Sequence, residues 1–279
     1  MLKRILLAYD GSPYSEAAKT YALELAQAHG SMLNALFVID QGILAGPRVA
    51  VPGPTFVPIE VVSYEDYQSA QDEMKDKGRR YLERLGQEAA AAGVGFQELL
   101  RVGYPDQVIL REGRSYDLIV LGRKGNSDIK EETLGYTGEM LASNSAVPLL
   151  LAPKEHSSID RCLLAYDGSQ QAVRAMRSLR QVLDGTRWPV TVVTVRERGR
   201  TSEATANEAV EYFSAHGVQV DTLIKEGDPS RVILEGIQES GADILAMGAF
   251  GHRGLRELFL GTTTAKILSQ SPVAVLLSH

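Results

Sequence analysis

Cysteine and histidine are scarce in this sequence of 279 residues. Cys162 is its single cysteine, so an intrachain disulfide cannot form, and its place inside an apolar run predicts a small buried hydrophobic residue. A reducing, cytoplasmic environment fits this cysteine usage. His29, His156, His216 and His279 lack the spacing of metal ligands, so we expect no metal site built from them.

Long apolar runs and an excess of positive charge are also missing. No apolar stretch approaches the roughly 18 residues that span a bilayer, and Asp10 interrupts the apolar N-terminal run too early for a secretory signal. The sequence therefore predicts a soluble protein with no membrane partner. Its 29 basic and 35 acidic side chains give a net charge of −6, which argues against nucleic acid as a partner.

What the sequence does contain is an internal repeat. The heptapeptide Leu-Leu-Ala-Tyr-Asp-Gly-Ser occupies positions 6–12 and again 163–169, which is typical of a duplicated domain. A glycine series with one spacing follows each copy, at Gly122, Gly125 and Gly135 and at Gly248, Gly251 and Gly261. The short polar stretch 154–158 has the composition of a linker, so we expect one domain at 1–153 and a second at 159–279.

Short apolar runs in both halves predict strands that are buried on both faces. They lie at 5–9, 33–39, 118–121 and 147–151, and at 162–166, 190–195, 244–247 and 273–277, with weaker middle strands at 96–102 and 218–225. Segments with helical periodicity separate them, so each half is predicted to be an α/β unit with a parallel sheet. The first half has about thirty extra residues, mostly in the proline-rich stretch 41–63, which we interpret as a mobile loop.

The two motifs of each half are expected to meet at one site. In an open α/β sheet, ligands bind beyond the carboxyl ends of the strands, where the strand order reverses. A strand order of 3-2-1-4-5 places Asp10, after the first strand, beside Gly122, at the end of the fourth. Glycines at a strand-to-helix turn allow close approach of the backbone, and the helix N-terminus offers N–H donors and a positive dipole end. This combination favours a phosphate.

Side chains near the glycines add to this prediction, while simpler interpretations stay open. Hydroxyl groups follow the last glycine of the second half and are able to donate to phosphate oxygens; they belong to Thr262, Thr263 and Thr264. His252 and Arg253 are candidates to face the phosphate, although exposed loop residues are usually only solvated. A glycine turn alone often only connects two elements and binds nothing. Asp-Gly-Ser before Pro13 is also a good helix cap.

The glycine spacing resembles the nucleotide-binding signature of the universal stress protein family, G-2x-G-9x-G-[S/T], which the second half completes with Gly261-Thr262. The Asp-Gly-Ser after the first strand points the same way, and the resemblance covers nearly the whole chain as two tandem domains. It implies a flavodoxin-like or Rossmann-like fold of five strands, as in the adenine nucleotide alpha-hydrolases. It also implies adenine nucleotide as the partner, either ATP or AMP, with or without Mg²⁺.

Carried over by position, the resemblance implies nucleotide contacts in both halves. Those of the second half are Ala165, Asp167, Val195, Met247, Gly248, Gly251, His252, Gly261, Thr262 and Thr263; those of the first are Ala8, Asp10, Val38, Gly122, Arg123, Gly125, Gly135, Tyr136 and Thr137. The first half departs from the family pattern at Tyr136, where Ser or Thr is expected. Arg123 and Lys124 are candidates to compensate with charge. We therefore expect tighter binding in the second half.

Because the family dimerises through its fifth strand, the runs 147–151 and 273–277 are predicted to pair within one chain. A single polypeptide then imitates the homodimer and covers an otherwise exposed sheet edge. Further association into a homodimer stays open.

Three functions remain open at this point. The first is a non-catalytic ATP-binding stress-response protein, with slow hydrolysis at most, because no general base is evident near either glycine loop. The second is an ATP hydrolase or nucleotidyl-transfer enzyme on the same fold, for which a glycine-rich turn directly after the first strand is expected. The third is a protein-interaction module that has lost its nucleotide, at least in the first domain.

Overall fold

A computed structural model describes residues 1–44, 64–126, 134–196, 202–249 and 260–279. The first half contains β1 (Arg4–Ala8), α1 (Pro13–His29), β2 (Met32–Asp40), α2 (Gln41–Leu44), α3 (Tyr64–Ala91), β3 (Gly95–Gly103), α4 (Pro105–Gly113), β4 (Leu118–Gly122), α5 (Tyr136–Asn144) and β5 (Leu149–Ala152). The second half contains β6 (Cys162–Ala165), α6 (Gln170–Val182), β7 (Val190–Val195), α7 (Ser202–Ala215), β8 (Val220–Lys225), α8 (Pro229–Ser240), β9 (Ile244–Gly248), α9 (Thr262–Gln270) and β10 (Ala274–Ser278).

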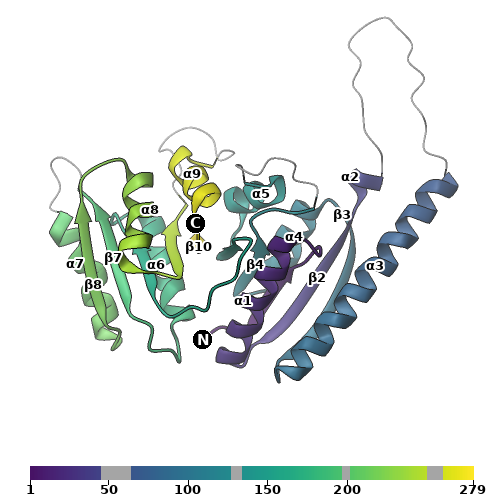
Figure 1. Cartoon of the computed structure of the whole chain (residues 1–279), viewed down its shortest axis with the longest axis horizontal. Helices are drawn as coiled ribbons and strands as arrows, with labels where there is room; N and C mark the ends of the chain where they lie inside the picture. The colour runs from purple at the N-terminus through teal and green to yellow at the C-terminus, as the bar shows by residue number, and fades with distance from the viewer. Residues whose placement is uncertain (45–63, 127–133, 197–201, 250–259) are drawn as a thin grey trace, which may run out of the picture.

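The described strands form one ten-stranded sheet in which the two halves lie side by side (Figure 1). The strand order is β3-β2-β1-β4-β5-β10-β9-β6-β7-β8, so each half has the order 3-2-1-4-5 with parallel neighbours. The prediction of two tandem Rossmann-like units is therefore confirmed. Of the proline-rich stretch 41–63, the first four residues form α2, and residues 45–63 lie outside the described part of the chain.

Each repeated Asp-Gly-Ser builds the start of a helix. In the first half the Asp10 carboxylate accepts the Ser12 N–H at 2.9 Å, and the Ser12 hydroxyl accepts the Ser15 N–H at 3.1 Å. The turn passes through Gly11 with a φ of +76°, a left-handed conformation that suits glycine. The second half repeats these bonds through Asp167 and Ser169. The helix-cap interpretation is thus confirmed, and the turn fixes each aspartate at the end of its strand.

Helices cover both faces of the sheet, and each face has one core that continues through both halves. Side chains of α1, α3, α6 and α7 pack on one face, and side chains of α4, α5, α8 and α9 pack on the other. Cys162 lies in the first of these cores with 1% of its surface exposed, and burial raises the pKa of its thiol above the usual range. The prediction of a small buried hydrophobic residue is therefore confirmed.

The halves join where β5 pairs antiparallel with β10. Leu149, Leu150 and Leu151 lie opposite Leu277, Leu276 and Val275, and all six side chains are fully buried. The predicted pairing of the two fifth strands within one chain is confirmed, although β5 begins two residues later than its apolar run. None of the helices in the described ranges is both long and apolar enough to cross a membrane.

Candidate functional site

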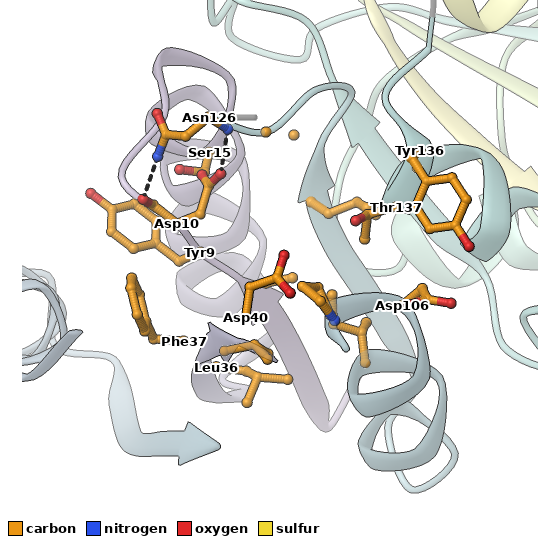
Figure 2. Close-up of a pocket in the computed structure, with 18 of the residues that line it drawn as sticks. Tyr9, Asp10, Ser15, Leu36, Phe37, Asp40, Asp106, Asn126, Tyr136 and Thr137 are labelled. Carbon is orange, nitrogen blue, oxygen red and sulfur yellow. Dashed lines mark hydrogen bonds between the residues drawn. The ribbon is translucent and has the colours of Figure 1, made fainter. Parts of the chain in front are cut away.

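A cavity of about 470 Å³ opens in the first half at the carboxyl ends of β1, β2 and β4 (Figure 2). Its apolar lining includes Ala8, Leu36, Val38, Ile109 and Leu121. The cavity lies where the strand order reverses, between β1 with β2 on one side and β4 on the other, which is the position expected for a ligand in this fold. The fold thus supplies the binding position that the sequence argument requires.

Seven of the nine residues expected to bind nucleotide in the first half line this cavity. They are Ala8, Asp10, Val38, Gly122, Gly125, Tyr136 and Thr137. Gly135 is the N-cap of α5 and, like Arg123, is not among the lining residues. Residues 112 or more positions apart therefore meet at one place, because β1 and β4 are neighbours in the sheet.

In the second half, the expected residues gather at the corresponding strand ends. Ala165, Val195 and the pair Met247 and Gly248 lie at the ends of β6, β7 and β9, and Asp167 follows β6 in the repeated turn. Gly261 is the N-cap of α9, and Thr262 and Thr263 are the first residues of that helix. Gly251 and His252 lie outside the described residues, as does Arg253. Thr264 is fully buried, so its hydroxyl is not open to a phosphate.

Asp10 ties the first strand to the loop that follows the fourth. One carboxylate oxygen accepts the Ser12 N–H and the other accepts the Asn126 N–H, both at 2.9 Å. The Asn126 side chain in turn donates to the Asp10 carbonyl at 2.7 Å (Figure 2). The aspartate therefore organises the backbone around the cavity. Asn126 was missed in the sequence, where its position directly after Gly125 was the one available signal.

A helix passes close to the end of each fourth strand, at Gly122 and at Gly248. A methyl group on Gly122 would lie 2.7 Å from the backbone carbonyl carbon of Tyr14 in α1. On Gly248 it would lie 2.6 Å from that of Gln171 in α6. The space beside these glycines is occupied by backbone, so each glycine is needed for packing. Their expected contact with nucleotide stays a prediction, and Gly122 also lines the cavity.

Arg123 is not among the cavity-lining residues and binds the other half of the chain, which corrects its expected role as a compensating charge for phosphate. Its guanidinium donates to the carbonyl oxygens of Leu268 at 3.0 Å and Ser271 at 2.6 Å, at the C-terminus of α9 in the other half. Burial lowers the pKa of this guanidinium below its usual value. A cation at a helix C-terminus is stabilised by the helix dipole, so Arg123 joins the first glycine loop to α9.

We expect Arg123→Ala to lower the free energy of unfolding by about 2 kcal/mol, because it removes two charge-assisted hydrogen bonds and leaves buried carbonyl groups without their donor. Urea-induced unfolding followed by circular dichroism measures this change. Arg111→Ala is the matched control, since the Arg111 side chain is exposed and contacts only its neighbour Glu112 among the ion pairs of the described residues. Equal midpoints for the two variants would contradict the assigned role of Arg123.

The repeated tyrosines bind side chains of the helices that pack beside them. Tyr9 donates its hydroxyl hydrogen to Glu16 and accepts a bond from Arg84. Tyr166 donates to Glu208 at 3.0 Å, and burial together with that carboxylate raises the pKa of Tyr166 to about 12. Both phenols therefore stay protonated near neutral pH. The described lining of the cavity also contains no histidine and no cysteine.

The helices that follow the glycine loops begin without a side-chain cap. The N-cap residues are Gly135 for α5 and Gly261 for α9, and neither makes a side-chain cap bond. A helix N-terminus of this kind presents backbone N–H groups and a positive dipole end to an anion. Tyr136 and Thr137, the first residues of α5, both line the cavity, which places this N-terminus at its wall.

The sequence and the fold are both similar to known proteins along the whole chain. A model of the universal stress protein family matches residues 1–153 and 191–279. The universal stress protein Slr1230 of Synechocystis is 24% identical over 290 residues, which cover 99% of each chain. The universal stress protein YxiE of Bacillus subtilis is 28% identical over 153 residues, 54% of this chain and 99% of its own.

A solved structure shares the full tandem arrangement. The crystal structure of a universal stress protein from Archaeoglobus fulgidus superposes with a TM-score of 0.77 at 25% identity. The superposition covers 99% of this chain and 97% of that one. Both halves and the junction between them are therefore similar to a known architecture.

Proposed function

The chain belongs to the universal stress protein family, and on this basis we propose that it binds ATP or AMP and acts as a nucleotide-dependent, non-catalytic regulator of a stress response. The proposed binding units are the domains 1–153 and 159–279, and the proposed location is the cytoplasm. The observation that carries the proposal is the cavity at the carboxyl ends of β1, β2 and β4, with an apolar side for a base and a helix N-terminus for phosphate.

The apolar side of the cavity suits a flat, weakly polar ring. Ala8, Val38 and Leu121 contribute small and branched side chains from three adjacent strands. A volume of about 470 Å³ lies in the range of small-molecule sites. Removing an adenine ring from water against these side chains supplies favourable burial energy, and we assign the base to this surface.

The phosphate end of the ligand is assigned to the start of the helix after the glycine loop. In the first half this is the N-terminus of α5, beside Gly125 and Thr137. In the second half it is the N-terminus of α9, where Thr262 and Thr263 offer hydroxyl donors. Mg²⁺ would accompany the triphosphate through its phosphate oxygens. Among the described residues, no group of three or more His, Cys, Asp or Glu side chains forms a metal site.

We propose that hydrolysis is slow or absent, although Asp10, Asp40 and Asp106 bring carboxylates to the described lining. An efficient hydrolase positions a base or a metal-bound water against the reacting phosphate. The tyrosine hydroxyls of the repeated motif are held by carboxylates, and the thiol of Cys162 is buried in the core. These features support a binding protein over the alternative of an ATP hydrolase or nucleotidyl-transfer enzyme.

Isothermal titration of the full chain with ATP, AMP and GTP, each with and without Mg²⁺, tests the proposal. We expect about micromolar affinity for an adenine nucleotide. Val38→Trp fills the apolar side of the first cavity, and Val195→Trp is the matched change at the end of β7. Each should remove one site and the pair should remove both, with melting temperatures as a check on folding. Absence of heat with every nucleotide, and of adenine nucleotide released from the purified protein, would contradict the proposal.

A further inference from the structure

The first-half cavity carries more negative than positive side chains. Asp10, Asp40 and Asp106 border it, from the ends of β1 and β2 and from the first turn of α4 (Figure 2). The positive groups of the described lining are Lys77 and Lys124. A site built for several phosphate charges is expected to have the opposite balance, because like charges repel strongly where water is partly excluded.

Asp106 is the most informative of the three carboxylates. Its side chain is 8% exposed and lines the cavity. It makes no hydrogen bond or ion pair with another side chain or backbone group in the described ranges. Asp40, in contrast, uses one oxygen to accept the Gly42 N–H at 2.7 Å. Because Asp106 lines the cavity and its carboxylate accepts no bond from the described residues, its oxygens are open to a ligand that brings N–H or O–H donors.

The second half differs at the matching positions. Ser230 stands where the first half has Asp106, each directly after the proline that begins its helix, and the Ser230 hydroxyl donates to Asp228. Thr262 stands where the first half has Tyr136, whose side chain is 63% exposed. The two halves thus share one backbone fold but differ in the side chains at these two positions.

The sequence shows the same contrast between the second and third glycines of each motif. Residues 126–134 contain three carboxylates and one lysine, a net charge of −2, whereas residues 252–260 contain two arginines and one glutamate, a net charge of +1 with histidine neutral. In the structure itself, the three carboxylates in the described lining of the first half disfavour a polyphosphate.

We propose that the two halves bind different adenine ligands, with the first half selecting the nucleoside or its monophosphate and the second half taking the triphosphate. This inference rests on the proposed function. In the first half, ribose hydroxyl groups donate to Asp40 and Asp106, and each further phosphate adds repulsion from the same carboxylates. Asp106 is the specificity-determining residue of this half, because the other half has a neutral serine there.

Photoaffinity labelling reads the two halves separately in the intact chain. The protein is irradiated with 8-azidoadenosine or 8-azido-ATP in the presence of adenosine, AMP or ATP as competitor, and labelled peptides are assigned to each half by mass spectrometry. In the first half we expect adenosine and AMP to compete at concentrations about tenfold lower than ATP, a difference that one or two nearby charges can produce. In the second half we expect ATP to compete best.

Substitutions taken from the chain itself test Asp106. Asp106→Ser installs the residue of the second half, and Asp106→Asn keeps the shape while removing the charge. Both should lower the ATP concentration needed for competition in the first half by about tenfold, without changing the second half. Asp72→Asn is the matched control, because Asp72 is an exposed carboxylate paired with Lys75 on α3. It should leave both halves unchanged, and melting temperatures verify folding.

The outcomes separate this inference from the proposed function. If both halves are labelled and ATP competes in the first half as well as adenosine does, the selectivity is wrong while nucleotide binding stands. If the wild type shows the selectivity but Asp106→Ser and Asp106→Asn keep it, the role of Asp106 is wrong. If neither half is labelled by either probe, nucleotide binding itself is overturned.

Discussion

Gly248→Ala is expected to lower the free energy of unfolding by about 3 kcal/mol, because the added methyl group overlaps backbone rather than a flexible side chain. It would lie 2.6 Å from the carbonyl carbon of Gln171 and 2.8 Å from the amide nitrogen of Ala172. These atoms belong to the first turn of α6, so the whole helix start has to move. Urea-induced unfolding followed by circular dichroism measures the loss.

The same substitution at another glycine provides the control. Gly236 lies inside α8, and a methyl group there would be 3.5 Å or more from its nearest neighbours, which are side chains of Leu163 and Val193. Gly236→Ala should therefore be neutral or stabilise by up to about 1 kcal/mol, since alanine is the better helix former. If the two variants unfold at the same urea concentration, the close packing of β9 against α6 is not important for stability.

A shift of α6 should also reach the proposed second site. Asp167 and Ser169 form the turn that leads into this helix, so movement of its first turn displaces the aspartate at the end of β6. We therefore expect Gly248→Ala to weaken nucleotide binding in the second half more than in the first. Gly122→Ala is predicted to weaken nucleotide binding in the first half more than in the second, because its methyl group would overlap Tyr14 at the start of α1.

Leu276→Asp is the second variant with a large expected effect, a loss of about 4 kcal/mol or more. Leu276 is 0% exposed and faces Leu150 where β10 pairs with β5. The change removes buried apolar surface and introduces a carboxylate with no partner in the middle of the sheet. Because one core cluster contains both leucines and continues through both halves, the junction and the two domains should weaken together.

The pH dependence of Leu276→Asp gives a second measurement. Burial raises the folded-state pKa of the new carboxyl group above its unfolded value, so the penalty grows as pH rises above the unfolded pKa and levels off above the folded one. The variant should therefore lose less stability relative to the wild type at low pH than at neutral pH. Val102→Asp is the control, because Val102 lies on the edge strand β3 and is 40% exposed. A similar loss in both variants would contradict the central role of the junction.

The local features of the fold could be predicted from the sequence because they depend on residues close together in the chain. The apolar runs lie within two residues of the observed strand ends, since a strand buried on both faces needs an uninterrupted apolar segment. Asp-Gly-Ser forms its turn from the bonds of neighbouring residues, so Ser12 and Ser169 are helix caps in both halves. The repeat itself indicated two copies of one fold, and the apolar fifth strands suggested their pairing.

The composition of the binding cavity was predicted only in part. Positions such as Ala8, Asp10 and Gly122 follow from the rule that ligands gather at strand ends. The same rule, applied to the second strand and to the start of the following helix, would also have indicated Asp40 and Asp106. Asn126 gave little signal, because its partner Asp10 is 116 positions away in the sequence.

By itself, the amino-acid sequence determined the repeated α/β units, their strands and the turn that places each aspartate, because these depend on short-range hydrogen bonding and on the pattern of apolar residues. Only the tertiary structure decided that Gly122 and Gly248 make room for a helix, and that Arg123 reaches α9 in the other half. It also decided that Asp106 meets Asp40 and Asp10 around one cavity. Such contacts join residues far apart in the chain, and their identity depends on how the strands and helices pack in three dimensions.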